Sequence, residues 1–257
     1  MLKRKNDSHK GDNGKIMIVG GSEMFHGAPI LSALAAEHSG VDLIFPYIPP
    51  CQAEAAKSYS LNFIIQKFSE NILTNKDVKS ILNLSKKMDV MVIGPGLGTN
   101  IKTKQAVKSI VSHITIPTVI DASALFYTNS FPKTTVLTPH RGEFKEMTGD
   151  EPTVKNVQKW AKQLGVTIVC KGHEDIIARG EEIAINKTGN SYMTVGGTGD
   201  VLSGLLGGLI AQGMDSFEAC KYGTKILGLV AENQTELQGN FRAIDLVNGI
   251  SGMIKTN

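Results

Sequence analysis

Short apolar runs recur along the chain and predict buried β-strands. Each run spans only a few residues, and most end in glycine, proline or a polar residue. A continuous apolar run of this length, bounded by turn residues, is typical of a strand that is covered on both faces. The pattern predicts strands at Lys15–Gly20, Val41–Phe45, Phe63–Gln66, Asp89–Gly94, Pro117–Ile120, Thr135–Leu137 and Thr167–Cys170.

Longer segments with helical periodicity separate these runs. Ala28–Ser39 has the alanine and leucine content of a helix that packs on a sheet. Asn75–Met88 follows Thr74, and either Thr74 or Asn75 is a suitable N-cap. The other predicted helices are Ile101–Ser112, Glu143–Thr148, Thr153–Leu164, Val201–Gln212, Ser216–Gln234 and Ala243–Ile254.

Strands and helices alternate through most of the chain, so we expect an α/β fold with a mainly parallel central sheet and helices on both faces. Two further strand-like runs, Ile176–Arg179 and Glu182–Asn186, flank Gly180-Glu181 and predict a β-hairpin. The chain contains no internal repeat, low-complexity stretch or recognisable linker. We therefore expect a single domain over residues 1–257.

Several glycines and polar residues follow predicted strands. Gly98, His140, Lys171 and the loop Gly196–Asp200 all have this placement. The carboxyl ends of parallel strands meet at one edge of the sheet, where open α/β folds bind their ligands. We therefore expect these residues to form a ligand site, although a single loop histidine is more often a structural hydrogen-bonding group.

The most informative stretch is Gly189–Asp200, which leads directly into the apolar helix Val201–Gln212. A glycine-rich turn that opens a helix directs several free backbone N–H groups towards one point. The helix dipole adds partial positive charge there, so the stretch predicts a phosphate site.

An aspartate at this position would repel a phosphate, so Asp200 needs another explanation. We interpret it as a base that takes a proton from a second reactant, which predicts phosphoryl transfer from a nucleotide to a hydroxyl. The alternative is that Thr198 or Asp200 only caps the helix. Two features favour the functional interpretation: the glycine pair Gly196-Gly197, and the small helical residues Ser203, Gly204, Gly207 and Gly208. Each helical glycine costs about 1 kcal/mol, so several together imply close backbone packing.

Composition and charge narrow the class of protein. The net charge of +3 is too small to indicate nucleic acid as the main partner, and the three cysteines have no metal-binding spacing. No apolar stretch reaches the roughly 18 to 20 residues of a membrane span, and the polar segment Met1–Gly14 is unlike a signal peptide. We expect a soluble, cytoplasmic protein without a membrane partner.

Taken in order, the motifs resemble those of the ADP/ATP-dependent NAD(P)H-hydrate dehydratases, a branch of the ribokinase-like superfamily. The resemblance covers nearly the whole chain. The motifs that carry it are Val19-Gly20-Gly21-Ser22, Gly27-Ala28, Gly94-Pro95-Gly96-Leu97-Gly98, Asp121-Ala122, Leu137 to Phe144, Lys171-Gly172 and Gly189 to Gly204.

The resemblance implies a ribokinase-like fold and the repair of NADH and NADPH hydrated on the nicotinamide ring, the S-forms of NADHX and NADPHX. ADP or ATP phosphorylates the ring hydroxyl, and phosphate then leaves to restore NADH or NADPH, with AMP or ADP as the other product. Asp200 would be the catalytic base, and the N–H groups of Gly197, Thr198 and Gly199 would stabilise the transferring phosphoryl group. The sequence has no side-chain motif for a metal, so Mg²⁺ would bind through the phosphates.

The resemblance also distributes the two reactants over the site. It implies that Ala28, Gly98, His140 and Asp200 bind NADHX or NADPHX. Lys171 would meet a phosphate as a point charge, although a surface lysine is usually only solvated. The residues implied for the adenine nucleotide are Lys171, Gly172, His173, Glu174, Asp175 and Gly199, with Asp175 standing where the family usually has threonine.

Family members often form homotetramers, and many also carry an N-terminal epimerase domain. We expect a homo-oligomer, and a separate epimerase protein that acts on the same metabolite, because this chain is too short to hold both domains.

Three other functions are compatible with parts of the sequence. A small-molecule kinase of the same superfamily, acting on a thiazole- or pyridoxal-type alcohol, would share most motifs, but thiazole kinases typically carry cysteine in place of Asp200. A non-catalytic nucleotide-binding protein would not need a base beside the phosphate site. A Rossmann dehydrogenase is disfavoured because Gly20 and Gly21 are adjacent and Gly27 comes too late for the motif.

Overall fold

The computed structural model describes residues 4–128 and 130–254, and its centre is one mostly parallel sheet. The strand order is β3-β2-β1-β4-β5-β6-β7-β8-β9 among the described residues. Strands β1 to β7 run parallel, and β8 and β9 form the antiparallel hairpin that the sequence predicts. The strands are β1 (Lys15–Val19), β2 (Leu43–Ile48), β3 (Gln66–Lys67), β4 (Val90–Ile93), β5 (Thr118–Ile120), β6 (Thr135–Leu137), β7 (Thr167–Cys170), β8 (Asp175–Arg179) and β9 (Glu182–Asn186).

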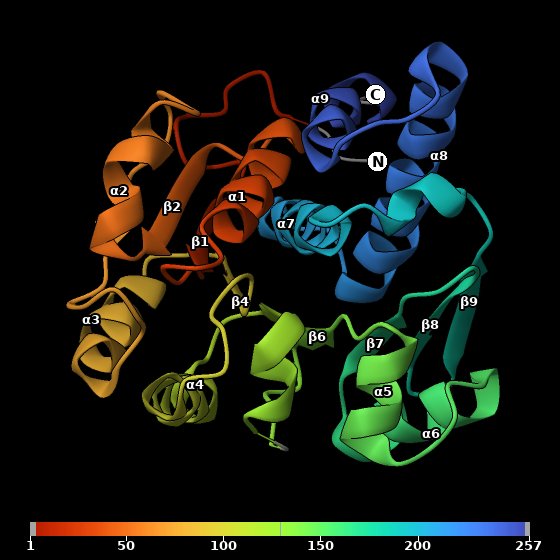
Figure 1. Cartoon of the computed structure of the whole chain (residues 1–257), viewed down its shortest axis with the longest axis horizontal. Helices are drawn as coiled ribbons and strands as arrows, with labels where there is room; N and C mark the ends of the chain where they lie inside the picture. Colours follow the sequence, from red (N-terminus) through yellow and green to blue (C-terminus); the bar gives the residue numbers. More distant parts are fainter. Residues whose placement is uncertain (1–3, 129, 255–257) are drawn as a thin grey trace.

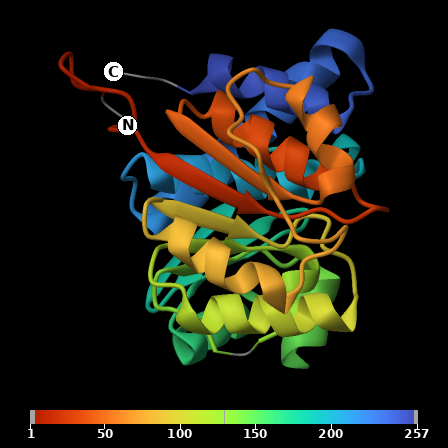
Figure 2. The same cartoon turned by 90° about the vertical axis from the view of Figure 1, so that its left-hand side faces the viewer.

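Helices cover both faces of the sheet, as Figures 1 and 2 show. The helices α1 (Gly27–His38), α7 (Thr198–Ala211), α8 (Ser216–Gln238) and α9 (Ala243–Met253) lie on one face. The opposite face carries α3 (Asn75–Ser85), α4 (Ile101–His113), α5 (Arg141–Thr148) and α6 (Val154–Leu164). A short helix, α2 (Pro50–Lys57), lies beside the β3 edge, and two 3-10 turns, η1 (Ala122–Phe126) and η2 (Ser191–Thr194), complete the elements.

Alternation of side chains along β1 explains how one strand serves two cores. Ile16 and Ile18 point into the core beneath α1 and α7, whereas Met17 and Val19 point into the core beneath α3 and α4. All four side chains are fully buried. A strand buried on both faces needs apolar residues at every position, so the predicted α/β fold with two helical layers is confirmed.

The structure differs from the sequence prediction at the β3 edge of the sheet. The predicted strand Val41–Phe45 starts later and continues through Pro46. β3 pairs with β2 only opposite Tyr47 and Ile48, apart from an isolated bridge, so no ladder bond to β3 is required at the proline. The helix α2 was not predicted, although a proline at its first position is a common start signal.

Helix α7 packs unusually closely against α1. A Cβ atom on Gly204 would overlap the backbone of Ser32, and one on Gly208 would overlap the side chain of Ser39. These contacts proceed in the same direction along both helices, so α1 and α7 run parallel, side by side (Figure 1). The close backbone packing predicted from the helical glycines is confirmed. Within the described chain, no helix is both long and apolar enough to cross a bilayer.

Candidate active site

The loops after β1 and β4 meet where the strand order changes direction. The chain leaves β1 towards β2 on one side, while β4 flanks β1 on the other, and such a switch point is where open α/β sheets bind ligands. The N–H of Gly21 donates to the carbonyl of Pro95 at 2.8 Å. Ala28 packs against Gly96, and the hydroxyl of Tyr127 fixes Gly98 by donating to its carbonyl at 2.6 Å. The structure therefore brings Ala28 and Gly98 into one loop cluster.

A separate cavity of about 730 Å³ opens between the end of β7, the N-terminus of α7 and helix α8. Most of the residues that the sequence analysis assigned to nucleotide binding and catalysis line this cavity. Those that line it are His140, Lys171, Gly172, His173, Asp175, Gly197, Thr198 and Gly199. The sequence interpretation did not single out several other lining residues, namely Thr188, Met193, Leu202, Thr224 and Leu227.

Four predicted site residues do not line this cavity. Ala28 and Gly98 belong to the switch-point loops, and Glu174 pairs with Lys187 at 3.1 Å on the surface. Asp200 lies in the first turn of α7, and Ala28 lies in the first turn of α1. Because α1 and α7 run parallel with Ser32 beside Gly204, both first turns lie at the same level. Asp200 therefore stands where the two groups of predicted residues meet.

Asp200 is a half-buried carboxylate without a fixed partner. Among residues 4–128 and 130–254, its side chain accepts no hydrogen bond and forms no ion pair. The pKa of Asp200 is raised from 3.8 to about 7, mainly because the carboxyl group is buried. The nearby Asp121 carboxylate adds to this rise, and Lys171 opposes it. A carboxyl group that titrates near neutral pH is well suited to accept and release a proton.

The N-terminus of α7 has unused backbone donors, as the glycine-rich sequence predicts. Gly197 precedes the helix with φ +100°, and a Cβ atom there would lie 2.6 Å from Leu31. No side chain caps the helix, so the alternative interpretation of Thr198 or Asp200 as a cap is wrong. The N–H of Thr198 makes a long 3.4 Å bond to Val195, whereas helix geometry leaves the next N–H groups without intrahelical acceptors.

Lys171 is not the solvated surface lysine of the alternative interpretation. Its side chain is only 21% exposed, and its ammonium group lies 3.0 Å from Oδ1 of Asp121. Burial lowers the pKa of Lys171, but the carboxylates of Asp121 and Glu143 outweigh that effect and raise it overall. The lysine is therefore a charged group at the wall of the cavity.

Asp121 holds a position that the sequence interpretation did not assign to the site. It follows β5 directly, its side chain is 3% exposed, and the hydroxyl of Thr138 donates to it at 2.7 Å. An acidic residue at the end of a fully buried strand is the sequence signal that could have identified it. Its partner Lys171 follows β7, so their proximity depends on the order of β5, β6 and β7 in the sheet.

His140 has a clear structural role. Nδ1 of its ring accepts the backbone N–H of Glu143 at 3.1 Å. The backbone N–H of His140 donates to the Glu143 carboxylate at 2.7 Å, and the two bonds form a capping box at the start of α5. The ring remains exposed and lines the cavity, so it is also available to a ligand.

Asp175 shapes the loop after β7. It accepts the N–H of Gly172 at 3.1 Å and the side-chain amide of Asn186 at 3.0 Å. Burial raises the pKa of Asp175, which the two hydrogen bonds and Lys171 only partly offset. Asp175 thus fixes the loop that follows Lys171.

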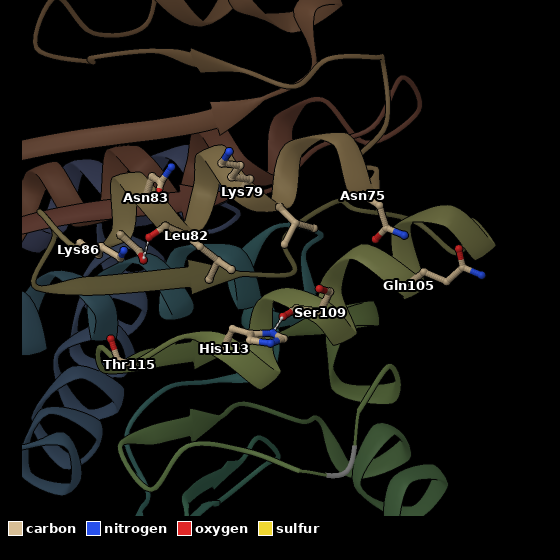
Figure 3. A pocket seen from close by; sticks show the side chains of 11 residues that line it. Asn75, Lys79, Leu82, Asn83, Lys86, Gln105, Ser109, His113 and Thr115 are labelled. Carbon is tan, nitrogen blue, oxygen red and sulfur yellow. Dashed lines mark hydrogen bonds between the residues drawn. The ribbon is translucent and has the colours of Figure 1, made fainter.

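No group of three or more His, Cys, Asp or Glu residues in the described chain could hold a metal ion. Another hollow, of about 710 Å³, lies between α3 and α4 (Figure 3) and contains none of the predicted site residues. Its histidine, His113, bonds through Nδ1 to the carbonyl of Ser109 at 2.8 Å.

The fold and the site define an α/β protein of the ribokinase-like class. The chain is similar to the crystal structure of a ribokinase-like superfamily protein from Enterococcus faecalis, with a TM-score of 0.89 and 25% identity over 98% of this chain and 90% of that one. The model of the NAD(P)H-hydrate dehydratase family matches residues 16–250. The chain belongs to the NAD(P)H-hydrate dehydratase family.

Individual relatives agree with this membership. An ADP-dependent (S)-NAD(P)H-hydrate dehydratase of Nitrosopumilus maritimus is 38% identical over 98% of this chain and 92% of its own length. The structure of an ADP/ATP-dependent NAD(P)H-hydrate dehydratase from Bacillus subtilis, co-crystallised with ATP/Mg²⁺, has a TM-score of 0.86 and 26% identity, covering 98% of this chain and 93% of that one.

A longer relative has a second part that this chain does not match. The bifunctional NAD(P)H-hydrate repair enzyme of Pyrobaculum aerophilum is 36% identical over 98% of this chain, which spans 52% of that protein. The chain therefore spans about half the length of this bifunctional relative.

Proposed function

We propose that this protein catalyses the ADP- or ATP-dependent dehydration of the S-forms of NADHX and NADPHX. The products are NADH or NADPH, phosphate, and AMP or ADP. Family membership and the relatives that act on NAD(P)H-hydrate support this proposal. The observation that carries it is the half-buried carboxylate of Asp200, whose pKa is about 7, in the first turn of α7.

The two groups of residues around Asp200 suit two reactants. The cavity of about 730 Å³ would hold the adenine nucleotide, with phosphate contacts from the lining residues Lys171, Gly172, His173, Asp175 and Gly199. The region around Ala28, in the first turn of α1, and Gly98, in the loop after β4, would hold the hydrated nicotinamide. His140, the N-cap residue of α5, would reach it from the cavity wall. In this arrangement Asp200 faces the ring hydroxyl.

The reaction then proceeds in two steps. Asp200 takes the proton of the ring hydroxyl as its oxygen attacks the terminal phosphorus, and the bond from that phosphorus to the rest of the nucleotide breaks. The free N–H groups at the start of α7 and the charge of Lys171 stabilise the transferring phosphoryl group. Phosphate next leaves with the electron pair of the ring C–O bond, and loss of a proton from the neighbouring carbon restores the double bond. Mg²⁺, when bound to the phosphates, would neutralise part of their charge.

One assay tests the reaction and identifies the donor. Hydrated NADH is incubated with Mg²⁺ and either ADP or ATP, and the return of reduced-nicotinamide absorbance is followed alongside release of phosphate. We expect both signals to rise together with at least one donor. In a parallel incubation, a thiazole- or pyridoxal-type alcohol replaces hydrated NADH. Nucleotide consumption there, with a stable phosphorylated product and no release of phosphate, would instead identify a kinase.

We further propose that the chain acts as a single domain over residues 1–257, in the cytoplasm, as a homotetramer. The continuous sheet supports one folding unit. An epimerase would supply the S-form, a proposal that the bifunctional name of the Pyrobaculum aerophilum relative supports. Sedimentation velocity tests the tetramer, and addition of an epimerase to a mixture of R- and S-hydrates tests whether full conversion needs the second enzyme.

A further inference from the structure

A buried ion pair lies directly below the N-terminus of α7. The ammonium group of Lys171 contacts Oδ1 of Asp121 at 3.0 Å, and the same oxygen accepts the hydroxyl of Thr138 at 2.7 Å. Asp121 follows β5 and Lys171 follows β7, and β6 lies between these two strands in the sheet. The ion pair therefore spans the end of β6. A pair with so little exposure needs accurate geometry, because each charge loses its hydration.

The backbone around Asp121 is held in a restricted conformation. Ala122, the next residue, has φ +52° and is the only non-glycine residue with positive φ in the described chain. A Cβ atom on Gly94 would overlap the carbonyl of Asp121, so β4 and the turn after β5 are in direct contact. Strain of this kind costs about 1 to 3 kcal/mol and persists where the surrounding structure enforces it. The turn thus fixes the direction of the Asp121 side chain.

The ion pair reaches the residues that flank the proposed base. A Cβ atom on Gly199 would lie 3.2 Å from Nζ of Lys171 and 3.9 Å from Oδ2 of Asp121. Asp200 is the next residue, and its carboxyl group has no hydrogen-bond partner of its own in the part of the chain that the structure describes. Burial is the largest influence on its ionisation, and the charges of Asp121 and Lys171 adjust it in opposite directions.

We propose that Asp121 is a positioning residue that anchors the Lys171 ammonium beside α7 and, through this pair, sets the proton affinity of the Asp200 carboxylate. The inference rests on the proposed function only in calling Asp200 the base. Asp121 does not touch either reactant in this account. It contributes a fixed negative charge and holds the positive charge in place.

The charges in this cluster predict opposite effects for the two members of the pair. Asp200 interacts with Asp121, a like charge, and with Lys171, an opposite charge. Lys171 also faces Glu143 of α5, and Asp175 lies on the same loop. Loss of the Asp121 charge leaves Lys171 acting on Asp200 alone, which favours the ionised carboxylate. Loss of the Lys171 charge leaves two acidic groups facing each other, which favours the protonated form of one of them.

Carbon-13 NMR of protein labelled at the aspartate carboxyl carbons tests this without turnover. The Asp200 resonance is identified by its absence in Asp200→Asn, and its titration midpoint is measured in the unliganded protein. In Asp121→Asn we expect the midpoint to fall by about one pH unit, and in Lys171→Gln to rise by about one pH unit. Lys171→Gln retains a hydrogen-bond donor for Asp121, so it gives a reading even if Asp121→Asn does not fold.

Asp77→Asn is the matched control. Asp77 is also buried, at 2% exposure, but it accepts the N–H groups of Ser69 and Thr74 at the start of α3. Its replacement removes a buried carboxylate elsewhere and should leave the Asp200 midpoint unchanged. Equal midpoints in all variants, or shifts of the same sign in Asp121→Asn and Lys171→Gln, would overturn the proposal.

The same variants separate this inference from the proposed function. If the assay with hydrated NADH gives turnover, the acidic limb of the pH profile of kcat/KM should move in the same direction as the NMR midpoint of Asp200. A purely structural role would lower kcat at every pH and leave that limb in place. If the NMR midpoints move as expected while hydrated NADH is not dehydrated, the charge network stands and the proposed reaction fails.

Discussion

At the scale of single residues, the central feature is a carboxyl group that titrates far above its ordinary range. Burial is the main cause, and the neighbouring charges of Asp121 and Lys171 act on it in opposite directions. The sequence predicted Asp200 as a base from its place beside a glycine-rich turn. It could not predict the pairing of Lys171 with Asp121, because 50 residues separate them and only the strand order brings them together.

Replacement of Asp200 by asparagine should abolish most turnover. The amide keeps the size of the side chain but cannot accept the hydroxyl proton, so kcat should fall by about 10² to 10⁴-fold. Nucleotide affinity, measured by titration calorimetry with ADP, should change little, because Asp200 does not line the cavity. Near-normal turnover in this variant would remove Asp200 from the role of base.

The same replacement should stabilise the protein at alkaline pH. The pKa of Asp200 is raised from 3.8 to about 7, so between these values the folded state keeps a proton that the unfolded state has lost. Stability therefore falls as pH rises through this window and stays low above it.

We expect Asp200→Asn to raise the free energy of unfolding by about 2 kcal/mol at about pH 8, after allowance for solvent screening, and by much less at about pH 5. Denaturant unfolding at the two pH values measures the difference. An equal effect at both would contradict a raised pKa at this residue.

At the scale of elements, the sequence predicted most of the sheet because its strands are buried on both faces and appear as short apolar runs. β5 to β7 were predicted to within one residue. At the sheet edge, the predicted strand Phe63–Gln66 overlaps β3 only at Gln66, and α2 was not predicted. Edge elements bury only part of their surface, so their hydrophobic pattern is weak. The glycines of α7 were informative because they encode contact with another backbone.

A single methyl group should disrupt the contact between α7 and α1. In Gly204→Ala the new Cβ would overlap the backbone of Ser32, which cannot rotate away, so we expect a loss of about 2 kcal/mol in the free energy of unfolding. Gly252→Ala in α9 is the control, since no atom lies within 4 Å of its Cβ position.

The control should gain about 1 kcal/mol from the better helix propensity of alanine. Urea unfolding of both variants against the parent protein tests the pair. A neutral or stabilising Gly204→Ala would show that the two helices can move apart without cost.

At the scale of the whole molecule, the site joins segments from distant parts of the chain. Loops after β1, β4, β5, β6 and β7 meet the N-terminus of α7 at one sheet edge, as the alignment of polar residues after predicted strands indicated. The division into the cavity beside α8 and the switch-point cluster could not be predicted, because it depends on which helices stand between the loops.

A nucleotide that bridges these segments should stabilise the entire fold. ADP at about 100 times its dissociation constant contributes about 2.7 kcal/mol, which corresponds to a rise in Tm of about 5 to 10 °C for a chain of this size. Differential scanning fluorimetry measures the rise. Adenosine, which lacks phosphate, should give a much smaller rise in Tm. Equal rises for ADP and adenosine would show that the phosphates contribute little to binding.

The close contact between α7 and α1 also limits which parts of the cavity wall can move. Asp200 lies on a helix that is held against α1 by backbone contact, so we expect it to stay in place when a ligand binds. The opposite rim of the cavity, residues 188–195, rests on α8 through hydrogen bonds from Asn190 to Ala231 and Thr235. We expect any movement that widens the cavity to involve that rim, while the N-terminus of α7 stays in place.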